Sequence, residues 1–369
     1  MGVSPAVRRV ASLLPALALL EVGTVLSLYW LSFIVSRFPA GVDLDIPLRA
    51  AQRWIAGQPP YLAAASSAAS GHDLPFLYPP YVLPIVAPLL ALPRPVVLAL
   101  WDVTCGLVAL VALDRLAVPR RWWPAFLIWP PFTEPIWNGN IQVVLFAAYA
   151  IAFWRTRGPE DWRPLARSPD PTGLGARSGL MATFVGAVKA SQVHAWLLCA
   201  RWDRRGAAIG ASTLLVIAAL TLPLTGIGLY RDWLDQVAQA ANLAGDALGW
   251  PLVQYLPPPW PVAIIVGSLL AVLSLPKRDA AVWTGMLLVL GSPSVHEFSW
   301  LLCVPAMLRI RREAALVVAL AWTTYQPQIE WAAFAFLAGC LLASYRVSGL
   351  TAEPQLKSRP SSVAASSTT

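Results

Sequence analysis

Apolar runs of membrane-spanning length follow one another along most of this chain. They are roughly 14 to 25 residues long and are separated by short stretches rich in Arg, Pro and Trp; a helix of about 20 apolar residues crosses the ~30 Å hydrocarbon layer of a bilayer. Of the 369 residues, 57% are hydrophobic and 12% are charged, whereas an ordinary soluble domain is about one-quarter charged. Because the chain lacks the polar surface to cover so many apolar helices in water, it is predicted to be an all-α polytopic membrane protein.

The expected membrane segments number about eleven to thirteen, if helices that enter and leave on one side are counted with those that cross. Many of the 18 tryptophans lie at the ends of apolar runs, as expected of side chains that prefer the headgroup zone. The first expected segment covers 11–35. The others lie at about 79–93, 95–113, 122–136, 140–154, 179–199, 207–228, 261–275, 280–291, 298–308, 314–325 and 331–345.

The positions of the basic residues predict the orientation of the chain. Arg and Lys concentrate before the first segment and in short loops between later ones, and cytoplasmic loops are the ones enriched in these residues. The net charge of +8 is therefore attributed to cytoplasmic loops and not to nucleic-acid binding. We expect a single transmembrane domain over 1–346, with outer loops at 36–77 and 229–258, cytoplasmic termini and a disordered tail at 347–369.

The segment at 179–199 is expected to be a re-entrant hairpin. Basic clusters at 155–177 and 201–205 flank it on both sides, and if both are cytoplasmic the segment cannot cross the membrane once. We therefore expect a helix that dips in and returns, with Lys189 to His194 near its tip. Such breaks are tolerated where they line a cavity inside the protein.

The first outer loop carries two carboxylates ahead of a short helix. Apolar residues recur at helical spacing from Leu48 to Ile55, and Gly57-Gln-Pro-Pro60 ends the pattern, so a helix on the membrane surface is expected. Asp43 and Asp45 precede it at the lipid interface, where a carboxylate can accept a proton from a sugar hydroxyl as it attacks. A solvated loop carboxylate is the alternative.

Several short motifs then follow in a characteristic order. They are Asp43-Leu-Asp-Ile46, Gly57-Gln-Pro-Pro-Tyr61, Phe76-Leu-Tyr-Pro-Pro80, Asn138-Gly-Asn-Ile-Gln142, Gly186-Ala-Val-Lys189 and Ser292-Pro-Ser-Val-His296. This succession resembles glycosyltransferase family 87, with two amides of the fourth motif exchanged. The family comprises membrane mannosyltransferases of the GT-C superfamily that use polyprenyl-phosphate-mannose. The resemblance implies a GT-C-like helical bundle in a bacterial plasma membrane, which also suits the Arg-over-Lys, Ala- and Pro-rich composition.

The resemblance also implies the reaction and its partners. The enzyme would be an inverting glycosyltransferase that moves a sugar, by resemblance mannose, from a polyprenyl-phosphate donor to a glycolipid or cell-wall glycan acceptor at the outer face. Asp43 matches the catalytic aspartate, with Asp45 as the second choice. One carboxylate suffices because a lipid phosphate departs without a proton donor, unlike the leaving group in two-carboxylate glycoside hydrolysis.

The departing phosphate needs positive charge or donated hydrogen bonds in a dry site. Lys189, an ionisable residue inside an apolar stretch, is one candidate; snorkelling to the interface is its alternative. His296 is the other, and its alternative is an interfacial histidine bonded to Glu297.

Amides and tyrosines near these positions are candidates for binding the sugar. Asn138, Asn140 and Gln142 offer donors and acceptors for sugar hydroxyls, although Asn138 can equally cap a helix. Tyr61 and Tyr78 can stack on a sugar or anchor the chain at the interface.

No metal site is expected. The three histidines are far apart in the sequence and no group of acids has the spacing of metal ligands. No other cofactor is expected, and weak Mg²⁺ or Mn²⁺ binding at Asp43 and Asp45 stays an alternative.

Two non-enzymatic functions compete with sugar transfer. A lipid-linked sugar transporter or flippase would also contain broken helices and intramembrane charge, but no internal repeat typical of transporters is found. A membrane scaffold would leave Asp43, Lys189 and His296 replaceable.

Overall fold

The computed structural model describes residues 21–36, 39–62, 75–154, 175–240, 249–276 and 279–350. These residues form helices and loops, with no β-strand in any of the described ranges beyond one isolated bridge between Gly249 and Val295. The start of the first predicted segment, most of the basic loop at 155–177 and most of the tail at 347–369 lie outside the described residues.

The helices follow the predicted apolar segments closely. The first described helix covers Glu21–Ser36. The others are α2 (Val42–Ile55), α4 (Val82–Val86), η1 (Ala87–Ala91), α5 (Arg94–Arg115), η2 (Arg120–Trp122), α6 (Trp123–Ile128), α7 (Pro130–Asn138), α8 (Gln142–Phe153), α9 (Ala176–Val188), η4 (Ala190–Gln192), α10 (His194–Trp202), α11 (Arg204–Ala240), η6 (Leu252–Tyr255), α12 (Trp260–Ser274), α13 (Ala280–Leu290), η7 (Glu297–Cys303), α14 (Val304–Met307), α15 (Arg312–Ala321) and α16 (Pro327–Leu350).

Three described helices are long and apolar enough to cross a membrane. They are α5, α11 over Arg204–Gln239 and α16 over Pro327–Ser344. The remaining apolar helices are shorter, and proline accounts for some of the breaks because it removes an amide donor and restricts the residue before it. Pro130 and Pro131, for example, separate α6 from α7. The chain is thus an all-α membrane protein of long and broken helices.

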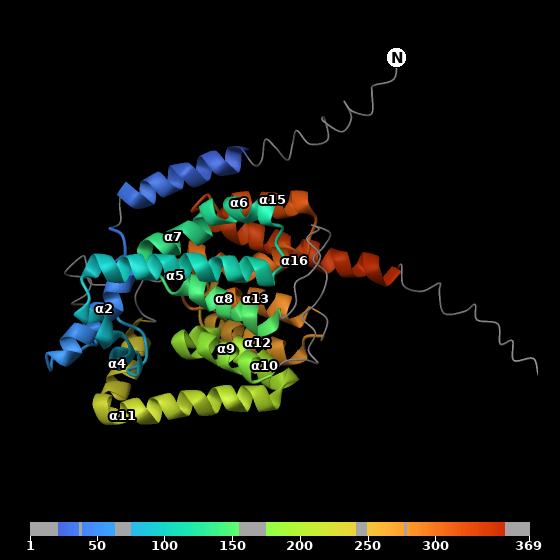
Figure 1. Cartoon of the computed structure of the whole chain (residues 1–369). Coiled ribbons are helices and arrows are strands. Elements are labelled where there is room, and N and C mark those ends of the chain that lie inside the picture. The colour runs from blue at the N-terminus through green and yellow to red at the C-terminus, as the bar shows by residue number, and fades with distance from the viewer. Residues whose placement is uncertain are drawn as a thin grey trace, which may run out of the picture.

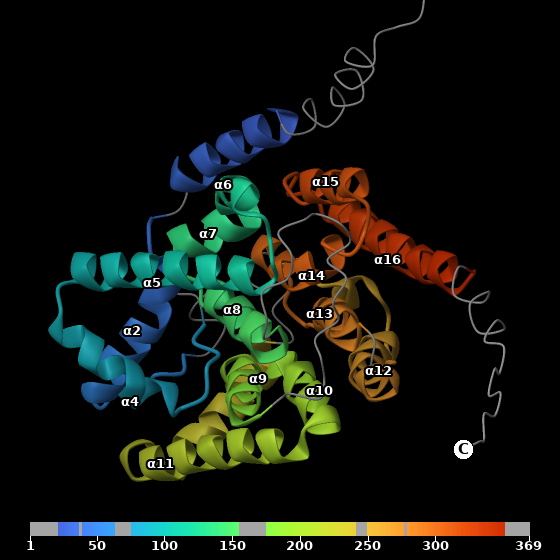
Figure 2. The same cartoon turned by 45° about the vertical axis from the view of Figure 1, so that its right-hand side comes forward.

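Helix α8 forms the centre of the bundle. Ten of its residues are buried, and it packs against α5, α9 and η7. The first helix and α11 lie at opposite edges of the bundle in both views of Figures 1 and 2. Helices α2 and α4 lie together at one end, away from the far end of α16.

Backbone-to-backbone contact joins α9 to α11. A Cβ atom added to Gly179 would lie 1.8 Å from the carbonyl oxygen of Gly206, and one added to Gly210 would lie 2.4 Å from that of Gly179. Small residues let membrane helices approach this closely, and packing contacts are a main source of their association energy. The α9–α11 interface therefore depends on the absence of side chains at these positions.

The predicted hairpin is present at α9 and α10. Helix α9 ends at Val188, Lys189 has an extended backbone, and α10 begins at His194 after the short helix η4. The two helices pack against each other, and a Cβ at Gly186 would lie 3.0 Å from the Cα of Val193.

Differences from the sequence-based expectation change the two predicted outer loops. Helix α2 begins at Val42, so Asp43 and Asp45 lie in its first turns and not in a preceding loop. Residues 229–240 of the expected outer loop 229–258 are helical, because α11 resumes after the non-helical backbone of Gly226.

Candidate active site

The amino end of α2 docks on the carboxyl end of α7. The N–H of Gly41 donates to the carbonyl oxygen of Trp137 at 2.8 Å. Gly139 has φ +75°, and a Cβ there would lie 2.6 Å from the Cβ of Leu44. A side chain at Gly139 would therefore be strained by the left-handed backbone and would also collide with α2.

This contact brings Asp43 to Asn140. Nδ2 of Asn140 donates to Oδ2 of Asp43 at 2.8 Å, although the residues are 97 positions apart. Oδ1 of Asn140 accepts from the backbone N–H of Gln142 at 2.9 Å, so the two bonds together orient the Asn140 amide. Oδ1 of Asp43 has no hydrogen-bond partner within the part of the chain that the structure describes.

Asp45 has a different environment from Asp43. Nε of Arg94 donates to Oδ1 of Asp45 at 2.9 Å and Nη2 of Arg94 donates to Oδ2 at 2.9 Å. Nη2 also donates to the carbonyl oxygen of Ala40 at 2.6 Å. This bidentate pair ties the start of α2 to the start of α5, and it occupies both oxygens of the Asp45 carboxylate.

Lys189 lies close enough to Asp43 and to His296 to interact electrostatically with each of them. Burial raises the pKa of Asp43, and the hydrogen bond from Asn140 and the positive charge of Lys189 lower it in part. Burial, together with the charge of Lys189, lowers the pKa of His296 to about 3, so the imidazole is neutral at ordinary pH. All three side chains are half-buried.

The two predicted tyrosines support this group from the loop that leads into α4. Burial and the negative charge of Asp43 raise the pKa of Tyr78. The hydroxyl of Tyr61 donates to the carbonyl oxygen of Tyr78 at 2.8 Å. Tyr81, which the sequence analysis did not select, donates to the carbonyl oxygen of Ala187 at 2.6 Å and links this loop to the end of α9.

The structure separates Asn138 and Gln142 from the hydrogen bond at Asp43. Nδ2 of Asn138 lies 3.5 Å from Oε1 of Glu134, one turn earlier in α7. Oε1 of Gln142 accepts from Nε2 of Gln192 at 3.0 Å. Both side chains are buried, and their side-chain partners are Glu134 and Gln192 rather than Asp43.

Sequence reasoning missed a set of buried carboxylates at the same end of the bundle. The hydroxyl of Tyr325 donates to Oε2 of Glu134 at 2.9 Å, and Glu297 lies beside Glu134. The indole groups of Trp250 and Trp300 donate to Oε2 of Glu330 at 3.0 and 2.9 Å. The available signal was the position of each acid at the end of an apolar run, where an intramembrane ionisable residue is a functional candidate.

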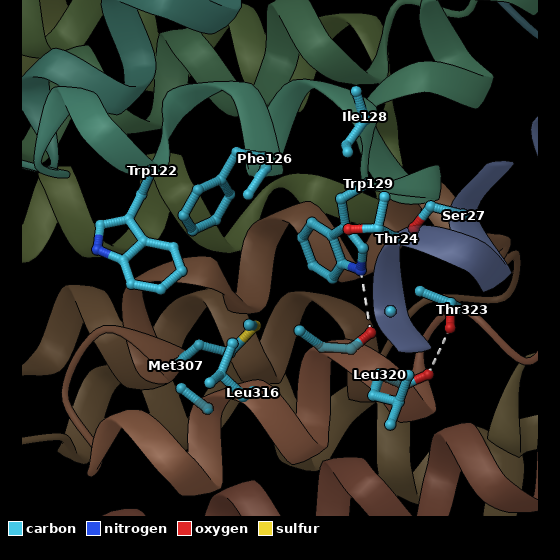
Figure 3. Close-up of a pocket in the computed structure, with 14 residues that line it drawn as sticks. Thr24, Ser27, Trp122, Phe126, Ile128, Trp129, Met307, Leu316, Leu320 and Thr323 are labelled. Atoms are coloured by element: carbon cyan, nitrogen blue, oxygen red, sulfur yellow. Dashed lines mark hydrogen bonds between the residues drawn. The ribbon is translucent and has the colours of Figure 1, made fainter. Parts of the chain in front are cut away.

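A separate apolar cavity of about 90 Å³ lies between the first helix, α6 and α15. Figure 3 shows Thr24 and Ser27 of the first helix facing Trp129, whose indole donates to the carbonyl oxygen of Ala319 at 3.0 Å. None of the predicted site residues lines this cavity.

The described residues contain no group of three or more His, Cys, Asp or Glu side chains placed to hold a metal ion. What the site offers is a carboxylate with one free oxygen, a lysine, a neutral imidazole and several amides. These groups are suited to accepting a proton, neutralising an anion and binding hydroxyls.

Comparison with known protein families matches residues 76–347 to Glycosyltransferase family 87. The matched range contains Tyr78, Asn140, Lys189 and His296, whereas Asp43 lies before it. No curated protein and no solved structure matched the chain.

Proposed function

Because the chain belongs to glycosyltransferase family 87 and is therefore a membrane glycosyltransferase, we propose that it transfers mannose from a polyprenyl-phosphate donor with Asp43 as the catalytic base. The observation that carries this assignment is the contact between Asp43 and Asn140. It holds one carboxylate oxygen and leaves the other available, whereas Asp45 is engaged by Arg94 through both oxygens.

The proposed reaction is a single inverting displacement. A hydroxyl of the acceptor gives its proton to Oδ1 of Asp43 while its oxygen forms a bond to the anomeric carbon of the sugar. The bond from that carbon to the phosphate oxygen breaks, and its electron pair leaves with the polyprenyl phosphate. The products are the extended glycan, the lipid phosphate and a protonated Asp43, which then returns its proton to solvent.

Lys189 and His296 are proposed to hold the phosphate of the donor. The lysine neutralises the charge that grows on the departing oxygen, and the neutral imidazole donates one N–H. Lys189 interacts electrostatically with both Asp43 and His296, so the lysine links the proposed base to the proposed phosphate site. A preorganised cation at the leaving group stabilises the transition state more than the ground state.

The outer face of a bacterial plasma membrane is the proposed site of the reaction, with both termini cytoplasmic. The support is topological: apart from Lys189 at the hairpin tip, the candidate site residues come from the ends of segments that the positive-inside rule places outside. Helices α2 and α4 lie at this end of the bundle (Figure 1). The acceptor is proposed to be a glycolipid or a cell-wall glycan, which would reach the site along the membrane.

Acidification is expected to decrease the rate of transfer because only the ionised form of Asp43 accepts a proton. Burial raises the pKa of Asp43 above the ordinary 3.8, so the decrease should begin at a higher pH than for a solvated aspartate. His296, with a pKa of about 3, stays neutral over this range. A profile of kcat/KM against pH measures the midpoint, and Asp45→Asn should leave it unchanged. A rate that rises on acidification would contradict the assignment.

Lys189→Met is expected to decrease kcat/KM by about 100-fold, the usual cost of removing one group that stabilises a departing or developing anion. Lys189→Arg keeps the charge and should recover a large part of the loss. Steady-state kinetics with varied donor concentration measures both variants. Equal activity of the Met and Arg variants would show that the charge at this position is not used.

Transfer and transport are distinguished by reconstituting the purified protein with labelled polyprenyl-phosphate-mannose and a glycolipid acceptor. Sugar transfer gives a labelled acceptor in open membranes. A flippase would instead move the intact donor across sealed vesicles without forming a new glycosidic bond. Movement without bond formation, at normal folding of the protein, would overturn the proposed function.

A further inference from the structure

Two buried glutamines meet where the hairpin tip contacts the start of α8. Gln142 is the first residue of α8 and Gln192 is the last of η4. Their side chains are 0% and 3% exposed, and Nε2 of Gln192 donates to Oε1 of Gln142 at 3.0 Å. This single bond satisfies only part of the hydrogen-bonding capacity of two amides.

One donor and one acceptor of this pair lack partners among the described residues. They are Nε2 of Gln142 and Oε1 of Gln192. Turning both amides over would reverse the bond between them, but it would again leave one carbonyl oxygen and one N–H group unpaired. Buried polar groups are nearly always paired in native proteins, and a single group that both donates and accepts would pair these two atoms at once.

The backbone of the pair is connected to the proposed catalytic base through Asn140. The backbone N–H of Gln142 donates to Oδ1 of Asn140 at 2.9 Å, and Nδ2 of Asn140 donates to Asp43 at 2.8 Å. On the hairpin side, the N–H of Gln192 donates to the carbonyl oxygen of Lys189 at 2.7 Å. The two amides are thus held by the same segments that hold Asp43 and Lys189.

We propose that Gln142 and Gln192 together bind one hydroxyl group of the transferred sugar and select for sugars that carry it. This inference depends on the proposed function. A hydroxyl accepts from the free N–H and donates to the free carbonyl oxygen, so it satisfies both amides at once. A phosphate oxygen only accepts and would leave the carbonyl oxygen unpaired. The pair is therefore assigned to the sugar, and Lys189 and His296 to the phosphate.

The test uses polyprenyl-phosphate-mannose donors that each lack a different hydroxyl group. With the unaltered protein, one of them is expected to lose about 100-fold or more in kcat/KM, because its binding leaves Nε2 of Gln142 and Oε1 of Gln192 without partners. In Gln192→Met and Gln142→Met, kcat/KM for the complete donor should fall toward the value for that same deoxy donor. The discrimination between these two donors should therefore disappear. Discrimination at the other hydroxyls should be retained.

Gln236→Met provides the matched control. Gln236 is 3% exposed and its Nε2 also lacks a partner, but it lies on α11 outside the pair; its variant should discriminate as the unaltered protein does. If a Met variant fails to fold, Gln192→Asn withdraws the amide by one methylene and should likewise reduce discrimination.

Three results would overturn the inference. Unchanged discrimination in active variants of both glutamines would remove it and leave the proposed function standing. An equal loss on every donor would show that the pair shapes the hairpin and does not recognise the sugar. If the unaltered protein transfers no sugar from any donor, the proposed function fails and this inference fails with it.

Discussion

Replacing Asp43 by Asn is expected to decrease the rate of sugar transfer by roughly 10³- to 10⁴-fold, near the upper end of what a positioned general base contributes. The substitution preserves the size of the side chain, and its amide oxygen can still accept from Asn140, so the protein should fold normally. What it removes is the ability to take a proton from the acceptor. Labelled-mannose transfer by purified protein in lipid measures the effect.

Asp45→Asn is the matched control for this experiment, since it makes the same chemical change two residues away. Arg94 is half-exposed, and exposed ion pairs contribute only about 0 to 1 kcal/mol to stability. We expect Asp45→Asn to keep the rate within about tenfold of the unaltered protein, because its carboxylate positions α2 and does not contact the reacting atoms. Normal transfer by Asp43→Asn, or loss confined to Asp45→Asn, would refute the assignment of Asp43.

Gly179→Leu is expected to prevent normal packing of the bundle. A Cβ at this position would lie 1.8 Å from a backbone oxygen of α11, so helices α9 and α11 must separate to admit any side chain. Overpacking costs about 1 to 3 kcal/mol where neighbouring side chains can adjust, and a backbone atom cannot move aside as a side chain does. The free energy of unfolding is therefore expected to fall by about 3 kcal/mol or more. A lower melting temperature or a loss of monodisperse protein in detergent measures this change.

Gly267→Leu in α12 makes the same change where no atom lies within 4 Å of the added Cβ. This variant should keep the melting temperature of the unaltered protein and so controls for the loss of a helical glycine. If the two variants melt alike, the close approach of α9 and α11 does not limit stability. Because α9 leads into Lys189, separation of these helices should also reduce transfer.

Local composition accounts for most of the helices. The segments expected at 140–154, 261–275 and 280–291 correspond to α8, α12 and α13, with boundaries that differ by only one or two residues. The break at Lys189 also followed from sequence, because basic clusters on both sides made one crossing impossible. These features depend on neighbours along the chain, through apolar run length, proline and charge.

The sequence-based expectations were wrong where contacts between distant segments set the ends of helices. Helix α2 starts six residues before Leu48, the first residue of the apolar pattern, because its amino end docks on Trp137 and Gly139. The continuation of α11 beyond Gly226 packs against the loop before α4, where the indole of Trp233 donates to the carbonyl oxygen of Leu77 at 2.9 Å. Neither contact leaves a periodic signal in the sequence.

The candidate site was likewise predictable from the sequence only in part. Motif resemblance selected Asp43, with Asp45 as the second choice, together with Asn140, Lys189 and His296. The tertiary structure distinguishes the carboxylates by their partners, Asn140 for one and Arg94 for the other. It also brings together Glu134, Glu297 and Glu330 from three separate helices.

The sequence by itself determined that this chain is helical, resides in a membrane and belongs among the glycosyltransferases. Each of these properties is encoded in short stretches, where hydropathy and motif act over a few helical turns. Only the tertiary structure decided which carboxylate keeps a free oxygen and which amides remain unpaired. Those properties arise when segments about 50 to 100 positions apart are packed together, and the partners of a buried polar group then follow from that packing.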